Sequence, residues 1–172
     1  MDISEDNYKI IKLFEIEFYP GPLTMILPCT TKLPSVVTSN TGFVGIRVPN
    51  NLNALNLIKK CQVPIAAPSA NKFGHISPTR KEHVLEDFKD CQENIYVLDN
   101  SDLPNIGIES TIIKFDFEKK QINILRPGYI TKDKLENFLK SKNLNFKVIE
   151  DIKYKKIGDI LNSSGELITH YA

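Results

Sequence analysis

The chain has 172 residues, of which 22 are Lys or Arg and 21 are Asp or Glu. This length fits one compact domain, and the near-neutral charge balance excludes a bulk electrostatic attraction to nucleic acid or to an anionic membrane. Cys29, Cys61 and Cys91 form no CxxC pair, which excludes a disulfide framework and a thiolate zinc site. The chain start lacks a basic region followed by an apolar stretch, so we expect a cytoplasmic protein without membrane association.

Hydrophobic spacing predicts the elements of the first half of the chain. Apolar residues three and four apart predict a helix over residues 7–18, which the turn at Pro20 ends. The next predicted elements are strands at 23–27 and 43–48, a helix at 53–60 and a buried strand at 63–67. This last strand leads into a loop at residues 68–71.

The second half continues the alternation of strands and helices. Thr79 and Glu82 form a capping-box pattern, which predicts a helix up to about Asp90. Further predicted elements are strands at 95–98, 110–115, 121–125 and 146–149, a hairpin turn at Lys119 and Lys120, and a helix at 131–139. Together they indicate an α/β (α+β) fold with a twisted, mixed parallel and antiparallel sheet and flanking helices.

Candidate binding residues stand where predicted strands run into loops. The sequence has no Walker A, GxGxxG, HExxH or GxSxG motif. Arg47 could hold a carboxylate or phosphate with its five-donor guanidinium, or form a surface ion pair. Ser69 and Asn71 lie in a small-residue loop that a ligand could approach, or that is a plain turn.

Four more positions add hydroxyl or guanidinium groups. Ser77 lies near a predicted helix start, where it could bind an anion or only cap the helix. Ser110 and Thr111 could be binding hydroxyls or ordinary strand residues. Arg126 is a second cation at a strand end, and the turn after it predicts an outward-pointing side chain that suits an anionic ligand. The three histidines, His75, His83 and His170, lack metal-ligand spacing and are interpreted as surface or packing residues.

A set of short motifs carries a family resemblance. In chain order they are PGPLT at 20–24, VGIRVP at 44–49, VPIAAPSAN at 63–71, SPT at 77–79, EHV at 82–84, GIEST at 107–111 and LRPG at 125–128. The residues of these motifs and their order along the chain resemble the YrdC family of threonylcarbamoyl-AMP synthases. The resemblance divides the chain into a YrdC-like domain at 1–139 and a connector with a linker-like tail at 140–172.

The resemblance implies an activity and roles for individual residues. The implied substrates are L-threonine, bicarbonate and ATP with Mg²⁺, and the product serves tRNA threonylcarbamoyladenosine modification. Arg47, Ala67 and Ser110 would hold threonine. Ser69, Asn71, Ser77 and Arg126 would hold the nucleotide, and Tyr171 would cover the site. No catalytic nucleophile and no protein metal site are implied.

Two departures from the family pattern keep alternatives open. The family opens with a strand, a Thr-Glu-Thr-Val-Tyr-Gly-Leu motif and an Arg-Pro loop, whereas only a predicted helix precedes Pro20 here. Phe43 stands where the family has a small hydroxyl residue, so its ring is expected to crowd the nucleotide. The alternatives are a non-catalytic nucleotide- or RNA-binding remnant and one half of a split enzyme. Contact with tRNA or double-stranded RNA, and a protein partner or homodimer at the truncated edge, stay open.

Overall fold

The fold was analysed in a computed structural model that describes residues 3–30, 32–72, 75, 78–91, 94–98 and 109–150. Ser77, His170 and Tyr171, three positions singled out in the sequence, lie outside the described residues. In the described part no helix has the length and apolar composition needed to cross a membrane.

The N-terminal helix confirms the predicted periodicity. Helix α1 (Glu5–Phe18) begins after Ser4, whose hydroxyl accepts a hydrogen bond from the Asn7 amide at 3.3 Å. Ile11, Phe14 and Phe18 are buried on one face of α1. The turn at residues 19–22 then leads into strand β1 (Leu23–Pro28), in which only Thr24 and Pro28 are not buried.

The described strands form one mixed sheet in the order β2-β1-β3-β4-β5. The four strands after β1 are β2 (Phe43–Ile46), β3 (Thr111–Asp116), β4 (Gln121–Arg126) and β5 (Lys147–Ile149). The pairs β1–β2 and β3–β4 are antiparallel, whereas β1–β3 and β4–β5 are parallel. The predicted mixed sheet and the β3–β4 hairpin are therefore confirmed.

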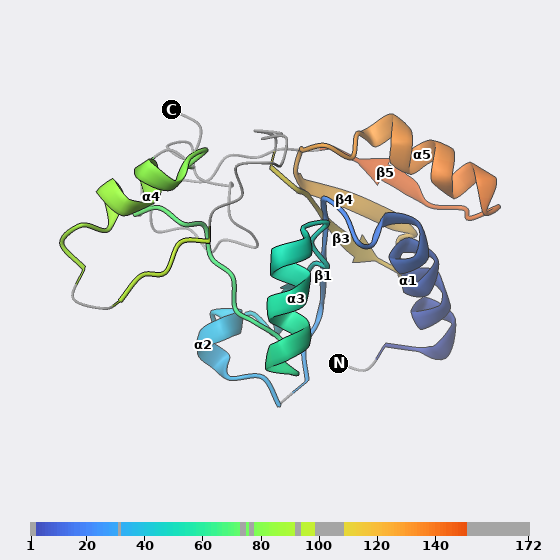
Figure 1. Cartoon of the computed structure of the whole chain (residues 1–172). Coiled ribbons are helices and arrows are strands. Elements are labelled where there is room, and N and C mark those ends of the chain that lie inside the picture. The colour runs from blue at the N-terminus through green and yellow to red at the C-terminus, as the bar shows by residue number, and fades with distance from the viewer. Residues whose placement is uncertain are drawn as a thin grey trace.

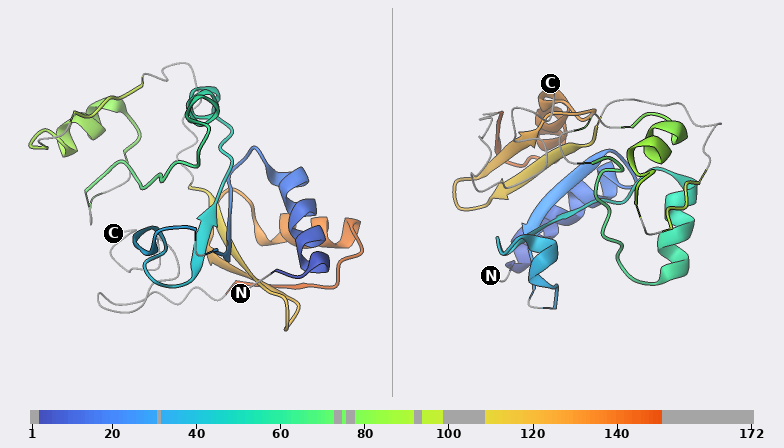
Figure 2. Two further views of the ribbon diagram at one scale, coloured as in Figure 1. Left: turned by 90° about the horizontal axis from the view of Figure 1, so that it is seen from below. Right: turned by 90° about the vertical axis from the view of Figure 1, so that its left-hand side faces the viewer.

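One face of the sheet carries the hydrophobic core. Leu23, Met25 and Leu27 of β1 face α1 and α5 (Lys132–Ser141), which lie together on the same side of the sheet (Figures 1 and 2). Phe14 stands at the centre, and its ring contacts those of Phe115 and Phe138 edge-on with centroid distances of 5.1 and 4.8 Å. The sheet is therefore packed on this face against a layer of helices.

The middle of the chain is packed differently. Helices α2 (Ser35–Thr38), α3 (Leu52–Cys61) and α4 (Lys81–Asp87) lie to the left of β1 in Figure 1, opposite α1 and α5. Neither α3 nor α4 has a buried residue. Among the described residues, every buried hydrophobic side chain falls within 11–27 or 112–148.

Three predictions for this middle part were wrong. Residues 63–67 and 95–98 form no strand, and residues 63–67 are all exposed. Helix α4 ends at Asp87, and its N-cap is Arg80 rather than Thr79. A run of small apolar residues becomes a strand only where a neighbouring strand takes up its backbone hydrogen bonds, and tertiary structure decides that.

The end of the described chain stays close to the sheet. Helix α5 confirms the helix predicted at 131–139: Thr131 is its N-cap, and the Thr131 side chain accepts a hydrogen bond from the Lys134 amide at 3.3 Å. Strand β5 then pairs in parallel with β4. Residues 147–149 thus lie in the sheet. The predicted division into a domain at 1–139 and a connector with a linker-like tail at 140–172 remains a prediction.

Candidate functional site

Four polar side chains lie at one end of the sheet, where strands begin or end. This end of the sheet is called the site edge. Strands β1 and β3 begin at this edge and β2 and β4 end there, because Leu23 is paired with Thr111, Met25 with Ile46 and Ile112 with Arg126. The edge therefore collects Thr24 from β1, Arg47 just after β2, Ser110 just before β3 and Arg126 at the end of β4. Arg47, Ser110 and Arg126 were predicted to be site residues, and the fold brings these three together.

Arg126 is the most tightly held of the four. Its Nε and Nη2 donate to the Ser110 carbonyl oxygen at 3.0 and 2.9 Å, and Nη2 also donates to Ser110 Oγ at 2.8 Å. Its Nη1 lies 2.9 Å from Glu109 Oε2 in an ion pair. The residue is only 9% exposed. The prediction that the turn frees Arg126 to point outward is wrong, because the guanidinium folds back onto Ser110 and Glu109.

Thr24 is a site residue that sequence reasoning did not single out. Its hydroxyl lies 3.1 Å from the Ser110 hydroxyl, so the two share a hydrogen bond in which either group can be the donor. Ser110 is 5% exposed and thus has its hydroxyl fixed between Thr24 and Arg126. Side-chain alternation along the strand could have indicated this residue. Thr24 stands between the core residues Leu23 and Met25, so its side chain must lie on the opposite face of the sheet.

Arg47 adds a second guanidinium beside this network. The residue is exposed to solvent overall, yet desolvation by the protein around it lowers the pKa of its guanidinium, and the charge of Arg126 lowers that pKa further. Arginine still keeps its proton at any physiological pH, so the lowered pKa expresses first the cost of desolvating the guanidinium and second its repulsion by Arg126. A bound anion that pairs with Arg47 would offset both costs.

Tyr19 fixes the strand end that carries Arg47. Its hydroxyl donates to the carbonyl oxygen of Ile46 at 2.5 Å. Burial raises the pKa of Tyr19 above its usual value, so the phenol stays protonated and remains a donor. The backbone directly before Arg47 is therefore anchored to the turn that follows α1.

The loop after Arg126 is locked to β3 by Thr111. The Thr111 hydroxyl donates to the Ile130 carbonyl at 2.8 Å and accepts from the Ile130 amide at 2.9 Å. Gly128 lies so close to the backbone that a Cβ there would stand 2.6 Å from Thr111 N and 2.7 Å from the Ser110 carbonyl carbon. Thr111, left open as a binding residue or a strand residue, is fully buried and serves this structural contact.

The face of the sheet opposite the core also carries side chains next to this cluster, and Ile26 and Ile112 on it are buried. A Cβ on Gly45 would meet Thr24 Cγ2 at 3.3 Å and Ile26 Cδ1 at 3.2 Å, which places these three residues on one face. Phe43 shares this face, and the Lys114 ammonium lies over its ring, 3.8 Å from the ring centroid. The Phe43 ring is thus engaged by a lysine.

The predicted loop residues Ala67, Ser69 and Asn71 differ in their surroundings. Ala67 and Ser69 are exposed in a segment without helix or strand. Asn71 Nδ2 donates to the carbonyl oxygens of His75 and Lys72 at 2.8 and 3.2 Å. Asn71 Oδ1 is buried with no hydrogen-bond partner among the described residues.

Asp87 of α4, a residue that no sequence pattern indicated, holds this loop in place. The Asp87 carboxylate accepts from the Lys72 amide at 2.8 Å and pairs with His75 Nδ1 at 2.5 Å. The hydrogen bond from the Lys72 amide, with a smaller effect of His75, lowers the pKa of Asp87. His75, interpreted as a surface or packing residue, is half of a surface pair that anchors the loop to α4.

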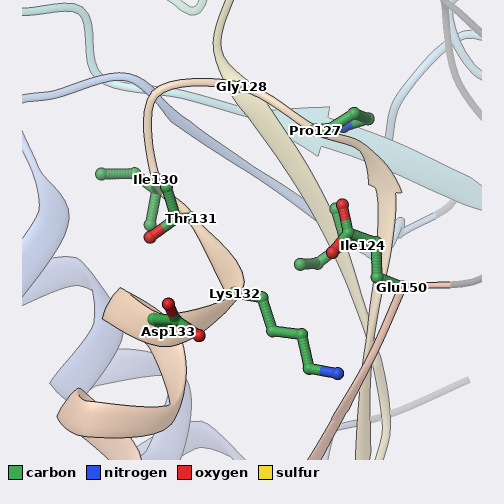
Figure 3. Close-up of a pocket in the computed structure, with 8 residues that line it drawn as sticks. All are labelled: Ile124, Pro127, Gly128, Ile130, Thr131, Lys132, Asp133 and Glu150. Atoms are coloured by element: carbon green, nitrogen blue, oxygen red, sulfur yellow. The ribbon is translucent and has the colours of Figure 1, made fainter.

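A cavity of about 360 Å³ lies behind the site edge, between the loop at residues 127–131, the start of α5 and the end of β5 (Figure 3). Its walls carry Lys132, Asp133 and Glu150 besides apolar groups. Neither Arg47 nor Ser110 lines it. Arg47, Ser110 and Arg126 gather at the strand ends instead, so we take that part of the sheet as the candidate site.

The sequence of the chain is similar to those of known enzymes. Residues 3–128 match the model of the Sua5/YciO/YrdC family, whose description reads telomere recombination. Threonylcarbamoyl-AMP synthases of Pyrococcus abyssi and Bacillus subtilis are each 38% identical to the chain, over 160 and 156 residues. Each alignment covers 90% of this chain but only 43% and 42% of the relative, so the chain spans less than half of their length.

Solved structures agree with the sequence matches. The crystal structure of P. abyssi Sua5 complexed with L-threonine superimposes with a TM-score of 0.78 at 33% identity, covering all of this chain and 46% of that one. Escherichia coli YciO shares the fold, with a TM-score of 0.56 at 18% identity over 74% of this chain and 58% of its own. The family match, the identities and the shared fold together show that the chain belongs to the Sua5/YciO/YrdC family.

Proposed function

We propose that the chain forms the substrate-binding face of a threonylcarbamoyl-AMP synthase. The enzyme would convert L-threonine, bicarbonate and ATP into threonylcarbamoyl-AMP and pyrophosphate for threonylcarbamoyladenosine modification of tRNA. The observation that carries this proposal is the cluster of Arg47, Ser110 and Arg126 at one sheet edge, in a chain that is 38% identical to such synthases. Because the chain spans less than half of these relatives, the activity is proposed for the protein that contains this part.

Arg47 and Ser110 suit an amino-acid ligand. The exposed guanidinium of Arg47 can take the threonine carboxylate in a bidentate pair. The Ser110 hydroxyl, held by Thr24 and Arg126, presents a fixed polar group beside it. Ala67 would line the same pocket with a small side chain. The relative from P. abyssi was crystallised with L-threonine, which supports this ligand.

The nucleotide would lie along the loop at residues 67–77. Ser69, Asn71 and Ser77 would donate to the phosphates or the ribose, and Tyr171 would lie over the bound substrates. Arg126 is already committed to Ser110 and Glu109, so it would act mainly through its positive charge at short range. Mg²⁺ would enter as a complex with the ATP phosphates.

The chemistry needs no covalent protein nucleophile. The threonine amine and bicarbonate give a carbamate and water. A carbamate oxygen attacks the α-phosphorus of ATP, and the bond from that phosphorus to the oxygen bridging to the β-phosphorus breaks to release pyrophosphate. A site that aligns the two substrates and neutralises the charge on the phosphates supplies most of what this step requires. Two guanidiniums and fixed hydroxyls meet that requirement.

The proposal is tested by titration and turnover of the same protein. Threonine and ATP with Mg²⁺ are titrated by calorimetry, and pyrophosphate release is assayed with bicarbonate present. Arg47→Met should weaken threonine binding by roughly tenfold or more, because a charged hydrogen-bonded pair is lost. Arg80→Met is the matched control, since Arg80 is an exposed arginine at the start of α4, and it should leave threonine binding unchanged.

Three results separate the candidates. Pyrophosphate release that requires both threonine and ATP supports the synthase. Binding of both ligands without release favours the alternatives, a nucleotide-binding remnant or half of a split enzyme, which the short span relative to known synthases also allows. Absence of threonine binding would contradict the proposal. The cytoplasm and contact with tRNA or double-stranded RNA belong to the same proposal and are tested by localisation and by RNA titration.

A further inference from the structure

The turn that follows α1 holds the backbone on both sides of Arg47. Strand β2 ends at Ile46, so Arg47 lies just beyond the last residue that is paired with β1. Before Arg47, the carbonyl oxygen of Ile46 accepts a hydrogen bond from the Tyr19 hydroxyl. After it, the carbonyl oxygen of Val48 accepts one from the Gly21 amide at 2.8 Å. Two contacts from one turn therefore enclose this site residue.

The Ile46 carbonyl belongs to the peptide group that joins Ile46 to Arg47. Because a peptide group is planar, a hydrogen bond that fixes its oxygen also fixes the nitrogen and the Cα of the next residue. Strand β2 is an edge strand, and no other described strand pairs with its outer side. The Tyr19 hydroxyl therefore sets the direction in which the Arg47 side chain leaves the backbone.

Tyr19 is itself held in place by the end of α1 and by the core. Its amide donates to the Glu15 carbonyl oxygen at 3.0 Å, and its half-buried side chain packs against the core cluster. Its neighbour Phe18 is only 5% exposed. A side chain packed in this way keeps one rotamer, so its hydroxyl is a donor in a fixed position.

The side chains of Tyr19 and Arg47 are close enough to act on each other electrostatically. Burial raises the pKa of Tyr19, and the charge of Arg47 is among the effects that oppose this rise. Desolvation and the charge of Arg126 lower the pKa of Arg47, and Tyr19 opposes that change. Mutual effects of this kind require a short separation between the two groups.

We propose that Tyr19 is a positioning residue for an amino-acid carboxylate: its hydroxyl, through the Ile46 carbonyl, holds Arg47 where the guanidinium can pair with that carboxylate. Tyr19 acts through Arg47 rather than by contact with the ligand. The inference rests on the proposed function for the identity of the ligand, and it deepens that function by naming the group that orients Arg47. Because the effect passes through Arg47, it should disappear when the guanidinium is removed.

The test is a double-mutant cycle on threonine binding, measured by calorimetry. Tyr19→Phe keeps the ring and its packing but removes the hydroxyl, so it should weaken threonine binding roughly fivefold. In the Arg47→Met protein the same change should cause no further loss. A general loosening of the fold would instead weaken binding in both backgrounds. Equal effects of Tyr19→Phe in the two backgrounds, or no effect in either, would overturn the proposal.

Tyr8→Phe is the matched control. Tyr8 belongs to the same helix, is 49% exposed and lies about three helical turns before Tyr19. This variant also loses one phenol hydroxyl, but at a position remote from β2. It should therefore bind threonine like the wild type, and a loss equal to that of Tyr19→Phe would contradict the assignment.

A measurement without ligand separates this inference from the proposed function. The chain has three arginines, Arg47, Arg80 and Arg126, so their Nε–H signals in an NMR spectrum can be assigned by substitution. Tyr19→Phe should shift the Arg47 signal and leave that of Arg80 in place. If the wild type bound no threonine, the proposed function would fail, whereas a shifted Arg47 signal would still support the inference. An unshifted Arg47 signal would overturn the inference whatever the threonine affinity.

Discussion

Single residues at the site are fixed by their buried partners. A buried guanidinium is tolerated when its donors are satisfied, and Arg126 uses Ser110 and Glu109 for this. Arg126 and Thr24 together hold the Ser110 hydroxyl in place. Any change that moves the backbone at residues 109–111 therefore affects both the local stability and the binding geometry.

Gly128→Ala tests this dependence. The new Cβ would meet the Glu109 carbonyl oxygen and would lie 2.6 Å from Thr111 N, both backbone atoms that cannot rotate away. We expect the free energy of unfolding, measured by urea denaturation, to fall by about 1–3 kcal/mol. We also expect weaker threonine binding by calorimetry.

Gly42→Ala serves as the comparison for that variant. Gly42 has a φ of +75°, and nothing lies within 4 Å of a Cβ placed there. Its substitution should cost about 1 kcal/mol through backbone strain alone and leave threonine binding unchanged. Equal effects of the two variants on threonine binding would show that the close approach of Gly128 does not position Ser110.

At the scale of elements, α1 and α5 support the site through an aromatic cluster. Phe14 of α1 is fully buried and contacts the rings of Phe18, Phe115 and Phe138. Phe115 belongs to β3, the strand that begins directly after Ser110. The position of the site edge thus depends on a helix that lies on the opposite face of the sheet.

Phe14→Ala should be strongly destabilising, because it leaves a cavity among three rings. We expect the free energy of unfolding to fall by about 3–5 kcal/mol in urea denaturation. Ile16→Ala changes a residue of the same helix that is 77% exposed and should shift this free energy by less than about 0.5 kcal/mol. A similar loss in both variants would mean that α1 does not pack as described.

On the scale of the whole molecule, the described residues divide into a well-packed part and a poorly packed part. Helices α1 and α5 with β1, β3 and β4 contain the core, whereas α3 and α4 have no buried residue. β2 is an edge strand of the described sheet, and its Ile46 is 44% exposed. Val63 and Ile65, further along the chain, are 61% and 41% exposed. Exposed apolar surface and an open strand edge favour association, so a partner or homodimer at this edge stays a prediction.

Hydrogen exchange measures this division directly. Amides of β1, β3 and β4 should exchange slowly in mass spectrometry, since their hydrogen bonds lie within the packed sheet. Amides of residues 63–71 and 94–98 should exchange faster by orders of magnitude, because these segments are exposed and have no ladder partners. Comparable protection in both groups, at a protein concentration low enough to keep the chain monomeric, would contradict this description.

Elements with strong local patterns could be predicted from the sequence alone. The helix predicted over residues 7–18, the β3–β4 hairpin and the mixed sheet follow from periodicity and turn residues, and the ordered motifs identify the family. Arg47, Ser110 and Arg126 could be selected because each stands at a strand end. Local pattern is enough where the spacing of apolar residues reports directly which face is buried.

Only the tertiary structure decided what those residues do. It turned Arg126 inward onto Ser110, added Thr24 and Asp87 to the site and its loop, and placed Lys114 over Phe43. It also left residues 63–67 exposed, although their composition predicts a buried strand. The physical reason is that strand formation, burial and charge pairing depend on neighbours far apart in the chain, and a local sequence pattern contains no information about which neighbours those are.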